Sequence, residues 1–86
     1  MRFISWLKEQ TKRTDQVGAF AKWASNNKKF PVSSDPALLK IFLLGQGLKG
    51  ELYGGFQMAY IEYSLSDKNQ VPKDYRTLDS LKEILL

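Results

Sequence analysis

Apolar residues recur at helical spacing along most of this chain, and no segment alternates apolar and polar residues as a half-buried strand does. The sequence also lacks internal repeats and low-complexity tracts. Its 86 residues suffice for one small domain with a single core. These features predict an all-α fold, a small bundle of four to five short helices.

Two amphipathic helices are expected at the start of the chain. The first should run for about three turns and pair Glu9 with Arg13 on its surface. Thr14 or Asp15 can cap the second, because a side-chain oxygen there accepts hydrogen bonds from the free amides of the first turn. Gly18 is expected to let another helix approach closely. The inward faces consist of Phe3, Trp6, Leu7 and Gln10 in the first helix and of Val17, Phe20, Ala21 and Ala24 in the second.

A third helix is predicted from a start signal and a run of apolar residues. Asp35 supplies a capping oxygen, and Pro36 takes the first helical position, where its missing N–H costs nothing. The apolar residues of 38–44 cover nearly the whole circumference. We therefore expect a buried helix at the centre of the bundle, ended by Gly45 and Gly47.

The fourth helix carries two apolar stripes and therefore needs two neighbours. It should end near Ser64, and its second stripe consists of Met58, Ile61 and Leu65. We assign residues 1–65 to the bundle, 66–77 to a polar linker and 78–86 to a C-terminal helix. That helix is too short to be stable alone in water, so it should dock on the bundle, with the second stripe as the expected dock.

Positive charge is concentrated in the first part of the chain. Residues 1–30 contain seven basic and two acidic residues, a net charge of +5, whereas residues 31–86 contain six basic and seven acidic residues, a net of −1. A basic half can bind polyanions such as nucleic acid or a membrane surface, or it can be a solvated face that keeps the protein soluble. The candidate nucleic-acid-binding residues are Lys8, Lys12, Arg13, Lys22, Lys28 and Lys29.

The turn between the third and fourth helices is similar to a helix–hairpin–helix turn. Gly45 and Gly47 are spaced as in that motif, which presents backbone N–H groups to a DNA phosphate, and Lys49 would add a cation. Gln46 stands where the motif has an apolar residue. The alternative is that the glycines only end a helix.

Eleven positions in the first third of the chain and three more near residue 60 resemble the YozE SAM-like family of small bacterial proteins. The resemblance covers residues 3–63 and departs from the family pattern at Ile4, Ala19 and Tyr60. It implies a SAM-like helical bundle of unknown biochemical role, with no catalytic residues to carry over. The matching residues are Phe3, Trp6, Leu7, Gln10, Arg13, Asp15, Val17, Gly18, Ala21, Phe30 and Pro31, followed by Ala59, Glu62 and Tyr63.

Several classes of function are excluded by composition. The chain has no cysteine and no histidine, so it cannot build a disulfide framework, a zinc finger, a thiol nucleophile or a serine–histidine pair. The acidic pair Asp79 and Glu83 is expected to be solvated.

No segment approaches the roughly 20 apolar residues that span a bilayer. The apolar run after Arg2 stops at Lys8, too early for a secretory leader, and we expect a cytoplasmic protein.

We therefore expect a non-enzymatic protein-interaction (adaptor) domain without cofactor, metal or membrane association. Its partner-binding residues would be Trp23, Met58, Ile61 and Leu65, since Trp is frequent in interface hot spots and the second stripe of the fourth helix needs a neighbour. The alternative is a nucleic-acid-binding accessory domain that uses the basic N-terminal half and the turn at 45–49.

Overall fold

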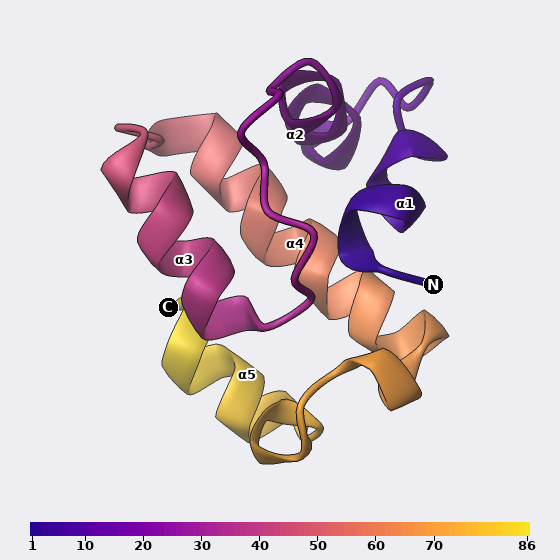
Figure 1. Ribbon diagram of the computed structural model, residues 1–86, viewed down its shortest axis with the longest axis vertical. Coiled ribbons are helices and arrows are strands. Elements are labelled where there is room, and N and C mark those ends of the chain that lie inside the picture. The colour runs from indigo at the N-terminus through magenta and orange to yellow at the C-terminus, as the bar shows by residue number, and fades with distance from the viewer.

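The computed structural model describes residues 1–86 apart from the side chain of Lys68. The described chain contains five α-helices and two 3-10 helices, and no strand, which confirms the predicted all-α bundle (Figure 1). The α-helices are α1 (Phe3–Lys8), α2 (Gln16–Ser25), α3 (Pro36–Gly45), α4 (Gly50–Ser66) and α5 (Leu78–Leu85), and the 3-10 helices are η1 (Lys68–Gln70) and η2 (Lys73–Tyr75).

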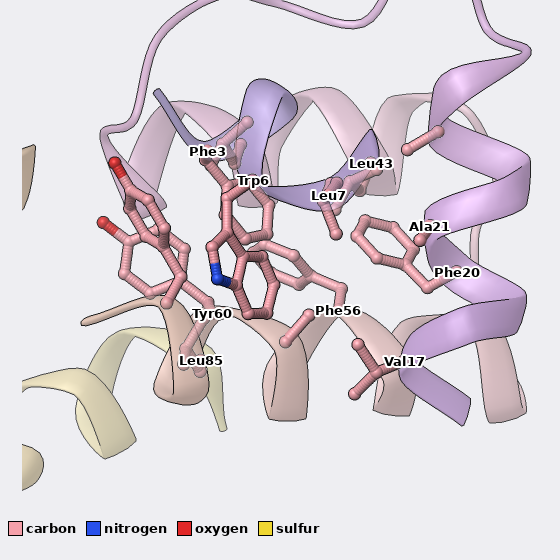
Figure 2. Packing of buried hydrophobic residues seen from close by; sticks show 14 of the residues in the cluster. Phe3, Trp6, Leu7, Val17, Phe20, Ala21, Leu43, Phe56, Tyr60 and Leu85 are labelled. Atoms are coloured by element: carbon pink, nitrogen blue, oxygen red, sulfur yellow. The ribbon is translucent and has the colours of Figure 1, made fainter. Parts of the chain in front are cut away.

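The core is built around an aromatic side chain of α1. α1 and α2 pack on each other and on α4, and α5 contacts both α3 and α4. Phe3 is fully buried where these helices meet (Figure 2). Six further aromatic rings surround Phe3, and their burial supplies much of the hydrophobic stabilisation of this short chain. The rings whose centroids lie 5.2–6.5 Å from that of Phe3 are Trp6, Phe20, Phe30, Phe56, Tyr60 and Tyr63.

The starts of α2 and α3 confirm the predicted caps. Asp15 accepts a hydrogen bond from the N–H of Gly18 at 3.0 Å, and Asp35 accepts one from the N–H of Ala37 at 2.9 Å. Pro36 follows as the first residue of α3. Each carboxylate satisfies an amide that has no partner within its own helix.

α1 is shorter than predicted and ends at Lys8. The next two amides bond to carbonyls only three residues back, from Glu9 to Trp6 at 3.1 Å and from Gln10 to Leu7 at 2.8 Å. These tight turns carry the chain into α2, so the expected pair of Glu9 with Arg13 does not form, and the side chain of Arg13 bonds elsewhere.

The expectation for Gly18 is also wrong, because no helix packs against it. A Cβ atom there would lie 2.0 Å from the carbonyl oxygen of Arg13, so the glycine makes room for the loop between α1 and α2. The close helix approach occurs at Gly55 of α4, where a Cβ would lie 2.4 Å from the carbonyl oxygen of Gln16 in α2.

The prediction that the third helix is buried at the centre is wrong. α3 lies at one side of the molecule, and Leu38, Ile41 and Leu44 are 53%, 69% and 54% exposed (Figure 1). Only its other face, with Leu39 and Leu43, reaches the core. A chain of this length lacks the additional elements that would cover a helix on all sides.

α5 packs on the bundle, with Leu81 and Leu85 buried. Its last turn meets the middle of α4, where Gln57 donates a hydrogen bond to the carbonyl oxygen of Leu85 at 2.6 Å. The prediction that α5 docks on the second stripe of α4 is correct only in part: Ile61 is half-buried and lines a hollow with Leu81, whereas Met58 and Leu65 remain 47% and 71% exposed. The docked helix contacts both α3 and α4.

Candidate functional site

The described residues contain no group of three or more carboxylate, histidine or cysteine side chains that could hold a metal ion. No helix in the described part of the chain is long and apolar enough to cross a membrane. The candidate sites are hollows on the surface of the bundle and the charged groups beside them.

Arg13 is held by two carboxylates. Its guanidinium bonds to Asp15 at 2.6 Å and to Glu62 of α4 at 2.8 Å. The hydrogen bond from Arg13, together with the N–H of Gly18, holds the pKa of Asp15 below its usual range, and the Glu62 hydrogen bond raises the pKa of Arg13. This predicted nucleic-acid-binding residue therefore joins elements of the fold, with its charge balanced.

The turn at 45–49 has the geometry of a helix C-cap, the simpler of the two readings of its glycines. The N–H of Gly47 donates to the carbonyl of Leu44 at 3.0 Å, and that of Leu48 donates to the carbonyl of Leu43 at 3.1 Å. Gly47 has φ +76°, the left-handed conformation that this Schellman arrangement requires. These bonds use the amides of Gly47 and Leu48, whereas the first turn of α4 has no side-chain cap and Lys49 is an exposed cation. Phosphate binding at this turn stays a prediction.

Trp23 lies at a solvent-facing hollow of about 580 Å³ near the ends of α2 and α3. The indole is half-buried and stacks on Phe20, with ring centroids 6.0 Å apart and an interplanar angle of 23°. Lys28 and Lys29 share the hollow, which we call the Trp23 hollow. Its other lining residues are Asn26, Asn27 and Gln46.

The other predicted basic residues are all exposed, and some of them share a hollow. Lys8 and Lys28 line a second hollow of about 230 Å³ on the other side of the loop that follows α2. Lys12 and Lys22 are exposed outside both hollows. The structure thus gathers three of the six basic residues around one loop.

A third hollow, of about 370 Å³, lies between α4 and α5, and we call it the α4–α5 groove. Apolar side chains from both helices line it, and Ser64, Arg76 and Thr77 add polar groups. Arg76 Nε donates a hydrogen bond to the carbonyl oxygen of Val71 at 2.9 Å, which fixes the guanidinium at this site. The apolar lining consists of Ile61, Leu65, Leu78 and Leu81.

Two of the four predicted partner-binding residues meet in this groove. Ile61 and Leu65 line it, whereas Met58 lies outside it and Trp23 belongs to a separate hollow. Sequence reasoning missed Arg76, because nothing in its local pattern shows that the chain between α4 and α5 returns it to the groove. The spacing of Leu78 and Leu81, three residues apart in the C-terminal helix, is a signal that could have placed them together on the α5 side of the groove.

No family model, no curated protein and no solved structure matches this chain. The resemblance to the YozE SAM-like family and the cytoplasmic location both stay predictions.

Proposed function

We propose that this protein is a non-enzymatic protein-interaction domain that binds a segment of a partner in the α4–α5 groove. The observation that carries the proposal is the apolar lining, which two helices share and solvent reaches. Leu65 and Leu78 both line the groove, and their side chains are 71% and 51% exposed. Exposed apolar side chains that gather in a hollow are typical of recognition sites.

The chemistry of the groove defines the partner segment. An apolar side chain of leucine size would cover the exposed parts of Leu65 and Leu78, and a carboxylate beside it would pair with Arg76. An amphipathic helix offers both groups at neighbouring positions. Met58, three residues before Ile61 on α4, would extend the contact surface.

The expected affinity is modest. Full burial of a leucine contributes about 1.5–3 kcal/mol, and these two side chains are already partly covered, so the pair adds about 2–4 kcal/mol. A charge-assisted pair at Arg76 would add about 1 kcal/mol on a surface that water still reaches. Binding of this strength suits a transient partner.

The test is a comparison of partners captured by three forms of the full chain. The doubly substituted variant Leu65→Asp/Leu78→Asp removes the apolar contact, and Ile41→Asp makes the same chemical change on the exposed face of α3. The proposal expects proteins that bind the wild type and the Ile41→Asp variant but not the groove variant, with the interaction then reproduced by calorimetry on purified components. Partners that all three forms retain would overturn it.

A further inference from the structure

The Trp23 hollow combines an aromatic ring with cations, and this combination lies far from the α4–α5 groove. One face of the indole stacks on Phe20, and the side chain remains half-exposed at the hollow. α2 and the turn after α3 lie at the opposite end of the molecule from α5 (Figure 1). A ligand in this hollow would therefore not compete with a partner in the groove.

The charges at the hollow are of one sign. Lys28 and Lys29 line it, and no acidic residue does so among the described side chains. Lys28 also lines the neighbouring hollow together with Lys8. These three exposed lysines form a cationic track that leads from the indole around the loop toward α1.

Amides surround the indole as well. Asn27 accepts a hydrogen bond from the N–H of Lys29 at 3.0 Å, which holds the loop in place. The Asn27 amide nitrogen lies 3.5 Å from Oε1 of Gln46, so the two side-chain amides are neighbours at the hollow. Asn26 and the Gln46 nitrogen form no hydrogen bond to any described side chain, and amides of this kind recognise the edges of nucleobases.

We infer that the Trp23 hollow binds single-stranded nucleic acid, with a base stacked on Trp23 and phosphates on Lys28, Lys29 and Lys8. A positively charged track beside an aromatic platform is the arrangement that binds single strands with little sequence preference. A duplex fits less well, because its bases already stack on one another and are not available to the indole. This inference goes beyond the proposed protein-interaction role and depends on different residues.

The first measurement is fluorescence anisotropy of a labelled single-stranded oligonucleotide of about ten nucleotides, a length within the range that small single-strand sites cover. The wild-type chain should bind it more tightly than the matched duplex. The logarithm of the binding constant should fall with the logarithm of salt concentration with a slope of about −2, since each of three phosphate contacts contributes about −0.7. No binding at low salt, or equal binding to the duplex, would overturn the inference.

Two variants assign the binding to these residues. Trp23→Leu keeps an apolar side chain on Phe20 but removes the stacking face, and we expect about tenfold weaker binding. Lys28→Glu/Lys29→Glu should weaken binding further and reduce the slope to about −0.7. Lys73→Glu/Lys82→Glu makes the same change of charge on exposed residues at the far end and should have a much smaller effect.

Fluorescence of Trp23 gives an independent readout. In the Trp6→Phe variant the indole of Trp23 is the chain's single tryptophan, and a stacked base should quench its emission as the oligonucleotide is added. Circular dichroism checks that each variant is folded, and the wild-type anisotropy series stands if Trp6→Phe does not fold. Binding that survives both the Trp23→Leu and the double lysine substitution, or that falls equally in the far-end control, would overturn the inference.

Discussion

Arg13 donates two hydrogen bonds to the carboxylate of Glu62, from Nη1 to Oε1 at 2.8 Å and from Nη2 to Oε2 at 3.1 Å. The two residues are 49 positions apart, so this contact ties the loop after α1 to α4. The same guanidinium also bonds to Asp15, which caps α2. One cation thus links three parts of the bundle.

Removing either partner of the Arg13–Glu62 pair should lower the free energy of unfolding. The two side chains are 33% and 41% exposed, so water screens the pair, and we expect a coupling of about 0.5–1 kcal/mol. A double-mutant cycle with Arg13→Gln and Glu62→Gln, measured by urea unfolding, gives this coupling directly. Additive effects of the two substitutions would show that the contact contributes nothing to stability.

Adjacent glycines of α4 should respond to alanine in opposite directions. At Gly55 a Cβ would lie 2.4 Å from the carbonyl oxygen of Gln16 and 2.9 Å from Cβ of Phe20, so α2 and α4 must separate. We expect Gly55→Ala to destabilise the fold by about 1–3 kcal/mol or more. At Gly54 the nearest atom would be the Gln16 amide nitrogen at 3.7 Å, an ordinary contact.

Gly54→Ala should therefore stabilise the protein by up to about 1 kcal/mol, because alanine is the better helix former. Thermal unfolding of the two variants beside the wild type tests the pair. A similar melting temperature for both variants would contradict the close approach of α2 and α4 at Gly55.

Local signals predicted the parts of the fold that depend on neighbouring residues. Asp15 and Asp35 act on amides two or three positions away, so their capping roles could be predicted without knowledge of the tertiary structure. The roles of glycines could not be predicted in this way. Gly18 and Gly55 look alike in sequence, and only the packing shows that Gly55 is the one that meets another helix.

The candidate sites, too, combine features that the local sequence predicted with features that only the packing of the helices shows. The helical spacing predicted that Ile61 and Leu65 share a face, which the α4–α5 groove confirms. The spacing could not show that the chain returns Arg76 to this face, or that Gln46 from α3 lies beside Trp23 of α2. Both juxtapositions depend on how the helices are arranged, and helical periodicity carries no information about that.

The two faces of α3 should tolerate substitution very differently. Ile41 is 69% exposed, so Ile41→Ser should change the free energy of unfolding by no more than about 0.5 kcal/mol. Leu43 is fully buried, and Leu43→Ala should cost about 2–5 kcal/mol. Urea unfolding of both variants is the measurement. A large loss for Ile41→Ser would restore the expectation of a central, buried helix.

Alkaline pH should unfold this protein through its buried tyrosines. Tyr60 is fully buried, and its hydroxyl donates a hydrogen bond to the carbonyl oxygen of Ser34. Burial raises the pKa of Tyr60 well above its ordinary value of 10.0, and the nearby Tyr63 and Asp35 raise it further. Burial also raises the pKa of Tyr53 and Tyr63.

The direction in which stability changes with pH depends on whether the folded or the unfolded chain keeps the Tyr60 proton. Below pH 10 both the folded and the unfolded chain keep the Tyr60 proton, so the full stability is present. Above pH 10 the unfolded chain releases the proton and the folded chain retains it, so stability falls as the pH rises toward the raised pKa of the folded state. Each such tyrosine should contribute a slope of up to about 1.4 kcal/mol per pH unit in this window.

Urea unfolding of the wild type and of Tyr60→Phe at a series of pH values from about 8 to 11 measures this slope, across the ordinary tyrosine pKa. At the neutral end Tyr60→Phe should be less stable by about 1 kcal/mol, because it lacks the hydrogen bond to Ser34. At the alkaline end its stability should fall less steeply than that of the wild type, because one of the three tyrosines with a raised pKa is absent. Equal slopes for the two proteins would show that Tyr60 ionises as readily in the folded chain as in the unfolded chain.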